Sequence, residues 1–200
     1  MNVSIHHVKQ ICLKSHSKTN NNQMELSFKT DKLYDDLNIS FFDLPEKQFD
    51  VVDSLPFPFQ FELPQYAFIN LEKTKEDSRF LNIDFPRYGA RLHMSYIKVD
   101  TNLPKLLNDA RTLVYKHLDK AQDITETSVY EESKRVFGVF YTLDGNTASG
   151  SQFYLTDSTN HFLRGALYFN VVPNFDSIAP VQTFITKDLR HLIKTVRWTE

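Results

Sequence analysis

Three strands in succession are predicted by residues 136–171, which read VFGVFYTLDGNTASGSQFYLTDSTNHFLRGALYFNV. Runs rich in Val, Phe, Tyr and Leu are separated by the polar segments DGNTASG and TDSTN. Connections this short require antiparallel neighbours, and Gly145 and Gly150 can supply positive φ in the first of them. In the last strand both alternating sets of side chains include apolar residues. This pattern predicts a central strand that is covered on both faces.

A long helix is expected after these strands. We expect Asp176 or Ser177 to cap it, and Pro180 is acceptable if it falls in the first helical turn. The apolar stripe recurs at three- and four-residue spacing and consists of Ile178, Val181, Ile185, Leu189, Leu192, Ile193 and Val196.

A second helix is predicted over 103–118, before the three strands. Its apolar residues recur at helical spacing, Thr101 or Asn102 can cap it, and Pro104 suits a first turn. The segment that follows, over 121–136, reads AQDITETSVYEESKRV and is acidic and polar. We interpret it as an exposed or broken helical connection.

Alternating side chains also predict strands in the N-terminal half. Residues 57–63, FPFQFEL, place three Phe and a Leu on one face, and residues 66–72, YAFINLE, are the expected partner. Because proline has no N–H, Pro56, Pro58 and Pro64 predict a strand at a sheet edge or beside a bulge. Two further strands are expected over 81–85 and 92–99, separated by the turn-forming PRYGA.

Together these elements predict one α+β domain, in which two main helices pack on a mainly antiparallel sheet. The order of elements is similar to the PsbP-type layout of photosystem extrinsic proteins, an analogy of fold that carries no function. We assign residues 31–200 to this domain. The polar stretch over 1–30, with its NNN run, is expected to be a mobile arm.

Composition excludes several classes of function. The chain has 200 residues, 41% hydrophobic residues and a formal charge of −2, so a general nucleic-acid-binding surface is not expected. One cysteine excludes an internal disulfide framework and any zinc site that needs two cysteines. The sequence has no phosphate-binding glycine motif, GxSxG elbow, HExxH or EF-hand loop. The motifs therefore give no support to a nucleotide site or an α/β-hydrolase, and we expect no metal ion.

The segment TDSTNHFLRG brings an aspartate, a serine and a histidine close together in the sequence. Asp157 can close the turn between two strands through its side chain, which is the interpretation we favour. The alternative is a hydrolase built on Asp157, Ser158 and His161. His161 and Arg164 are three residues apart on a strand, so they should point to opposite faces.

The helix over 103–118 offers one further candidate. A solvated helix face accounts for its polar residues, and Arg111 is the residue that we single out as an anion or partner contact. The four histidines of the folded part are expected to be structural, since they fall on four different elements: His93, His117, His161 and His191.

Several longer strings resemble the GldD family, the gliding-motility lipoproteins of the Bacteroidota. The resemblance runs from about Ile39 to Trp198, and its strongest block is TDSTNHFLRGALYF. The other strings that carry it are FFDLPEKQFD, LNIDFPRYGARLHMSY, NDARTLVYKH, SQFYLTDSTNHFLRGALYFNVVPNFDSIAPV and DLRHLIKTVRW.

This resemblance implies an accessory component of the gliding-motility machinery, which is tied to type IX secretion, with no enzymatic activity and no cofactor. Its partners would be other gliding or secretion proteins of the cell envelope. It also implies a periplasm-facing protein that a lipid anchor holds to a membrane, with Cys12 as the candidate lipidation site. No signal peptide or lipobox is recognisable in the first residues, because His, Lys and Gln interrupt their apolar residues.

The family offers no catalytic residues, so its polar residues are expected to support the fold or to face a partner. Besides Asp84, this polar cluster comprises Arg111, His117, Asp157, Ser158, Asn160, His161 and Arg164. A second interpretation stays open, in which the chain is a binding module for a small ligand or a cell-envelope ligand and uses a cleft between sheet and helix.

Overall fold

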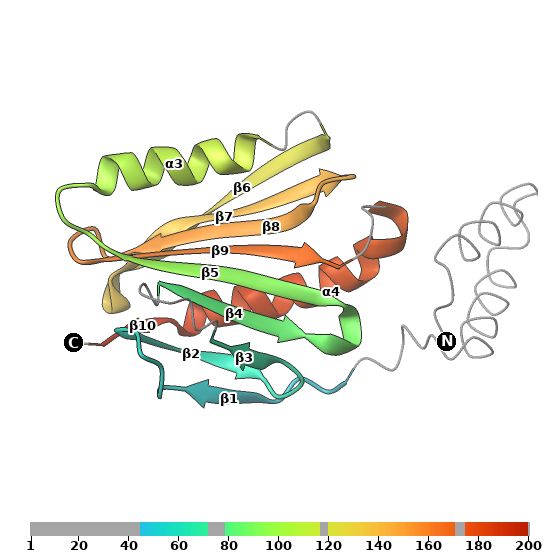
Figure 1. The fold of residues 1–200 in the computed structure, drawn as a ribbon, viewed down its shortest axis with the longest axis horizontal. Coiled ribbons are helices and arrows are strands. Elements are labelled where there is room, and N and C mark those ends of the chain that lie inside the picture. The colour runs from blue at the N-terminus through green and yellow to red at the C-terminus, as the bar shows by residue number, and fades with distance from the viewer. Residues whose placement is uncertain (1–44, 72–78, 117–119, 171–174, 200) are drawn as a thin grey trace, which may run out of the picture.

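A computed structural model describes residues 45–71, 79–116, 120–170 and 175–199, and it has an α+β fold (Figure 1). Its helices are α3 (Leu103–Tyr115) and α4 (Phe175–Thr195), with short 3₁₀ turns η1 (Pro86–Tyr88) and η2 (Glu132–Lys134). Its strands are β1 (Phe49–Val52), β2 (Phe59–Pro64), β3 (Phe68–Asn70), β4 (Phe80–Phe85), β5 (Ala90–Lys98), β6 (Ala121–Glu131), β7 (Val136–Gly145), β8 (Ser149–Thr156), β9 (His161–Phe169) and β10 (Arg197–Trp198).

The centre of the fold is a seven-stranded sheet in the order β3-β4-β5-β9-β8-β7-β6, antiparallel throughout. The three successive strands predicted over 136–171 are β7, β8 and β9, and Gly145 in the first hairpin has a φ of 105°. Strand β9 lies in the middle, and its Phe162 and Leu163 are both buried although they point to opposite faces. The sequence prediction of a doubly covered central strand is confirmed.

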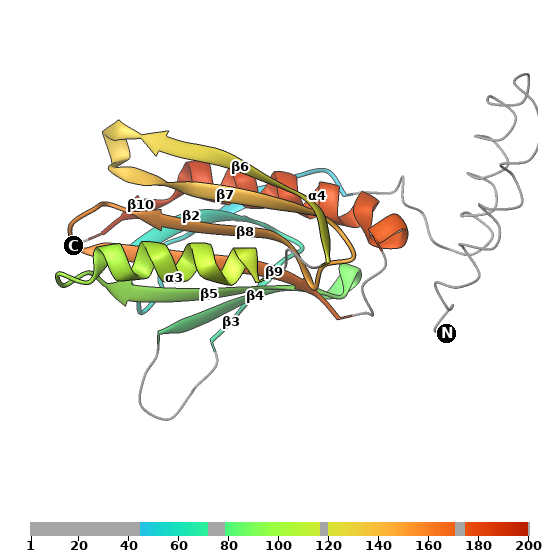
Figure 2. The ribbon, with the colours of Figure 1, turned by 90° about the horizontal axis from the view of Figure 1, so that it is seen from above.

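Helices cover the large sheet from both sides, as Figure 2 shows, with α3 on one face and α4 on the other. On the α4 face, β2 of a second, three-stranded sheet (β1-β2-β10) joins the same core. We call this face the inner face and the α3 face the outer face. The inner core is aromatic and aliphatic, and each of its large side chains adds about 1.5–3 kcal/mol by burial. It includes Phe59, Phe61, Phe153, Leu163 and Leu189.

The predicted helical connection over 121–136 is wrong, because residues 121–131 form the strand β6 and residues 132–134 form η2. β6 pairs with β7 alone, at the edge of the sheet, so most of its side chains are exposed and polar. Charged residues on an edge strand discourage pairing with other chains. Its strand propensity comes from the β-branched residues Ile124, Thr125, Thr127 and Val129.

The predicted environment of β2 is also wrong. β2 is the middle strand of the small sheet and pairs with β1 and β10, whereas β3, in the expected partner segment, pairs with β4. The prolines lie outside the ladder or at its end: Pro58 precedes β2, and Pro64 is its last residue. β10 lies far along the chain and leaves no local pattern, while β1 directly precedes β2 but has only four residues, so the sequence pointed to the segment that follows β2.

The predicted helix positions are confirmed, while their caps differ. α4 begins at Phe175, so Asp176 and Ser177 lie inside the helix and Pro180 lies beyond its first turn. Asn102 precedes α3 and Pro104 is in its first turn, as expected. However, the Asn102 side chain accepts the N–H of Asp100 at 2.9 Å instead of capping the helix.

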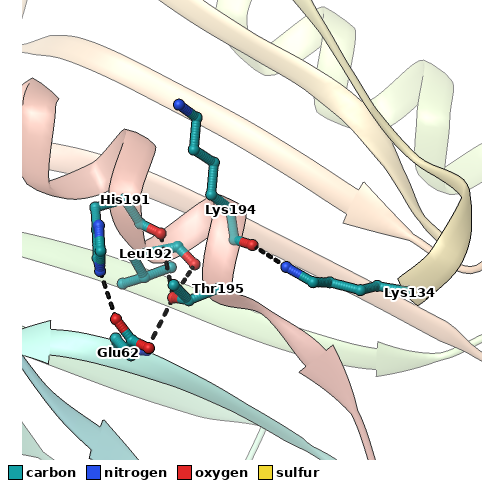
Figure 3. A network of polar contacts seen from close by, with 6 residues as sticks. All are labelled: Glu62, Lys134, His191, Leu192, Lys194 and Thr195. Carbon is teal, nitrogen blue, oxygen red and sulfur yellow. Dashed lines mark hydrogen bonds and ion pairs between the residues drawn. The ribbon is translucent and has the colours of Figure 1, made fainter.

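Polar contacts tie the last turn of α4 to two distant segments (Figure 3). His191 Nε2 lies 2.6 Å from Glu62 Oε2 on β2, and the Glu62 N–H donates to Thr195 Oγ1 at 2.9 Å. Lys134 in η2 donates to the carbonyl oxygen of Lys194 at 2.5 Å, where a cation suits the negative end of the helix dipole. The end of α4 is thereby fixed between β2 and η2.

A buried ion pair holds the middle of α4. Asp188, 1% exposed, accepts from Lys47 Nζ at 2.5 Å and from the Tyr66 hydroxyl. Burial, together with the hydrogen bond to Asp188, raises the pKa of Tyr66 far above its usual range. Because the Asp188 carboxylate is withdrawn from water, both partners are needed to satisfy it.

Candidate functional site

Asp157 closes the turn between β8 and β9, as the sequence predicts. Its Oδ1 accepts the N–H groups of Thr159 (3.0 Å), Asn160 (2.8 Å) and His161 (2.8 Å), and its Oδ2 accepts the Thr159 hydroxyl (2.8 Å). Burial opposes ionisation, but the hydrogen bonds from His161, Asn160 and Thr159 outweigh it and lower the pKa of Asp157 to about 2. This carboxylate holds the backbone of the turn, and Ser158 occupies it with a φ of 70°.

The His161 ring contacts residues other than Ser158. Its Nδ1 lies 2.9 Å from the Tyr96 hydroxyl, and its ring stacks on Trp198 with centroids 4.9 Å apart. Burial lowers the pKa of His161, although the charge of Asp157 acts in the opposite direction. Within the described residues the Ser158 hydroxyl has no hydrogen bond. The geometry therefore does not assemble Asp157, Ser158 and His161 as a hydrolytic triad, and the imidazole packs β10 against the large sheet.

Arg164 lies on the outer face, opposite to His161, as the spacing predicts. Its Nη2 donates to Gln152 Oε1 at 2.8 Å, and burial lowers its pKa. No carboxylate of the described residues lies within ion-pair distance of this guanidinium. Gln152 is 1% exposed, and its Nε2 has no acceptor among the described residues. Arg164 therefore contributes an uncompensated positive charge to the outer face.

The strand register arranges the outer-face residues of β3, β4, β5 and β9 in rows across the sheet. Phe80, Ser95 and Arg164 form one row. In another, Phe68 lies opposite Asp84, which is opposite Arg91. Arg91 Nε donates to Asp84 Oδ1 at 2.5 Å and lowers the pKa of that carboxyl.

Helix α3 does not cover this part of the outer face. It packs instead on Phe162, Tyr141 and Leu143. Phe68 and Phe80 are accordingly 59% and 49% exposed. We call the group Phe68, Phe80, Asp84, Arg91 and Arg164 the open patch.

A pocket of about 300 Å³ lies on the same face, between α3 and strands β6, β7 and β8. Arg111 projects from α3 into its rim, with the guanidinium 5.3 Å from the Tyr115 ring centroid. The contact with Tyr115 raises the pKa of Arg111. The pocket is lined by Leu107, Asn108, Arg111, Glu126, Val139, Tyr141 and Tyr154.

The residues singled out from the sequence do not form one cluster. Asp157, Ser158 and Asn160 share the β8–β9 turn, His161 lies on the inner face, Arg164 lies on the outer face and Arg111 lines the pocket. The arm over 1–30, Cys12 and His117 lie outside the described residues. No cluster of three metal-ligating side chains occurs in the described part of the chain.

Sequence reasoning missed the other residues of the pocket. Tyr141 and Tyr154 belong to strands that were predicted correctly, but the face that α3 covers could not be known from the sequence. Glu126 falls in the segment that was predicted to be a helical connection, so its contact with Tyr115 could not be predicted. The sequence offered one indication of the pocket, a tyrosine in each of two successive predicted strands.

A comparison with a family model supports the family resemblance noted in the sequence. The family model of the gliding motility lipoprotein GldD matches residues 14–198. The chain belongs to the GldD family. The match covers every described strand and helix, and Cys12 precedes it.

Solved structures show weaker likeness. The solution structure of cyanobacterial PsbP (CyanoP) from Synechocystis sp. PCC 6803 is 8% identical and covers 78% of this chain and 95% of that chain, with a TM-score of 0.48. The Saccharomyces cerevisiae Ran-binding protein Mog1p is also 8% identical, covers 78% and 97%, and has a TM-score of 0.48. No curated protein matches the chain. None of the helices in the described part has both the length and the apolar character needed to span a membrane.

Proposed function

We propose that this chain is a non-catalytic accessory component of the gliding-motility machinery, linked to type IX secretion, and that it acts by binding other envelope proteins. Membership of the GldD family supports the link to motility. The geometry supports the mode of action, because Asp157 and His161 have structural partners and the outer face is left partly uncovered.

The open patch is the observation that carries the binding role. It combines two exposed phenylalanines with the uncompensated guanidinium of Arg164. Aromatic side chains and arginine contribute most of the binding free energy in protein interfaces, and charged pairs at the rim contribute little. We therefore expect Phe80 and Arg164 to be the main contacts, and Asp84–Arg91 to set orientation.

Capture of partners from cells tests this role. Phe80→Ala should fold normally, and Arg164→Ala should stay folded but lose about 1–3 kcal/mol of stability because the buried Gln152 Oε1 loses its donor. Both variants should lose at least tenfold in partner capture, as interface anchors do. Val51→Ala is the matched control, since Val51 is 61% exposed but lies on β1 of the small sheet. Equal capture by all three variants and the native chain would reject the open patch as the docking site.

We further propose that the chain is held to a membrane, facing the periplasm, through acylation of Cys12. The lipoprotein description of the family supports an envelope location. The intact mass of the protein from its own cells tests the anchor. A chain that begins at Cys12 and carries a diacylglyceryl group, a form absent from Cys12→Ser, supports the anchor, and an unmodified cysteine contradicts it.

The pocket favours a second candidate function, the binding of a small ligand between helix and sheet. Its volume of about 300 Å³ lies at the lower end of the range for ligand sites, about 300–1,000 Å³. Its walls combine apolar side chains with a few polar groups, as ligand sites do.

A further inference from the structure

The charges of the pocket balance one another. Arg111 supplies one positive charge, and Glu126 on β6 supplies one negative charge. Each is also engaged by Tyr115, whose hydroxyl donates to Glu126 Oε1 at 2.7 Å and whose ring lies below the guanidinium. An anion attracted by Arg111 would therefore meet the Glu126 carboxylate. The pocket favours a ligand without net charge.

Two phenol hydroxyls in the pocket lack protein partners. Tyr141 is only 3% exposed although it lines the pocket, and within the described residues neither its hydroxyl nor that of Tyr154 makes a hydrogen bond. Burial raises the pKa of Tyr141 to about 12 and also raises the pKa of Tyr154. Both groups therefore remain protonated near neutral pH and can donate. Because neither hydroxyl is closed off from solvent, both are available to pair with a ligand that enters the pocket.

The remaining walls indicate the kind of partner. The Asn108 amide can donate and accept, while Leu107 and Val139 are apolar. The Tyr141 and Tyr154 rings are 6.5 Å apart and tilted by 43°. The pocket thus presents several donors and acceptors, no net charge and aromatic faces.

We propose that this pocket binds a neutral saccharide. Sugar hydroxyls both donate and accept, so one ring can satisfy the two phenols, the amide and the carboxylate together. The C–H face of the ring can then pack on tyrosine. A zwitterionic amino acid would satisfy only Arg111 and Glu126. This inference rests on the second candidate function and names its ligand class.

Amide NMR spectra of the full chain test the proposal, with cellobiose and diacetylchitobiose as neutral saccharide probes, glycine as a zwitterionic probe and phosphate as an anionic probe. We expect saturable shifts at Leu107, Glu126, Val139 and Tyr154 with at least one saccharide. Tyr141→Phe and Tyr154→Phe should each weaken binding about fivefold, the effect of one hydrogen bond. Tyr130→Phe is the matched control, since Tyr130 is exposed and lies on β6 outside the pocket.

The outcomes distinguish a failure of the saccharide assignment from a failure of the small-ligand function. Shifts with glycine or phosphate and none with a saccharide would overturn the ligand class and leave the small-ligand function standing. No shift with any probe would reject both. Saccharide binding that Tyr141→Phe and Tyr154→Phe leave unchanged would place the ligand elsewhere and also overturn the assignment.

Discussion

The two faces of the large sheet differ in how they are covered. The inner face is sealed by α4 and the small sheet, and its side chains are mostly Phe, Leu and Ile. The outer face is covered by α3 only in part, where the helix packs on residues from β5 to β6, and this face carries the pocket and the open patch. The proposed function thus separates binding from stability: the inner face holds the fold together, and the outer face is the one that we propose for binding.

The largest expected effect lies on the inner face. Phe153 is 1% exposed on β8, and its ring contacts Gly165 of β9 so closely that an added Cβ there would lie 2.4 Å away. Phe153→Ala should lower the free energy of unfolding by about 3–5 kcal/mol, because it removes buried area and leaves a cavity. Urea denaturation measures the change. A loss below about 1 kcal/mol would show that the inner core is not the main source of stability.

A smaller effect on stability is expected at the turn between β8 and β9. The pKa of Asp157 is lowered to about 2, so its contribution to stability is present above the ordinary pKa near 4 and is lost as the pH falls towards 2. Asp157→Asn should lower the free energy of unfolding by about 2 kcal/mol at pH 7. It should also flatten the acid dependence between pH 4 and pH 2. An unchanged pH profile would contradict the role of the carboxylate in the turn.

The smallest effect on stability is expected on the outer face. Phe80 is half exposed, so Phe80→Ala should change the free energy of unfolding by no more than about 0.5 kcal/mol. Thermal unfolding of this variant beside Phe153→Ala gives the contrast directly. A loss as large as that of Phe153→Ala would mean that Phe80 belongs to the core, and the separation of the two faces would fail.

The sequence predicted the elements whose formation depends on residues close together in the chain. The hairpins over 136–171 and both helices follow from spacing within one segment, and the structure confirms these elements. The partners of β2 could not be found in this way, because β10 comes from the far end of the domain and β1, although it directly precedes β2, has only four residues. β6 was missed because a solvated edge strand has the same polar composition as an exposed helix.

The candidate site was predictable only in part. Arg111 was singled out as an anion or partner contact and lines the pocket, and the Asp157 turn was identified from its residue types. Tyr141 and Phe80 could not be chosen, because an aromatic residue in a strand has the same pattern whether a helix covers it or not. Their exposure depends on where α3 lies across the sheet, which is a tertiary property.

Photo-crosslinking in the native cells tests the division between the two faces most directly. A photoreactive amino acid is placed at Phe80 or Phe68 on the outer face, and at Val51, of similar exposure to Phe68, on the small sheet. We expect light-dependent adducts with a gliding or secretion protein from positions 80 and 68 and none from position 51. Adducts from position 51 alone, or equally from all three positions, would contradict the assignment of binding to the outer face.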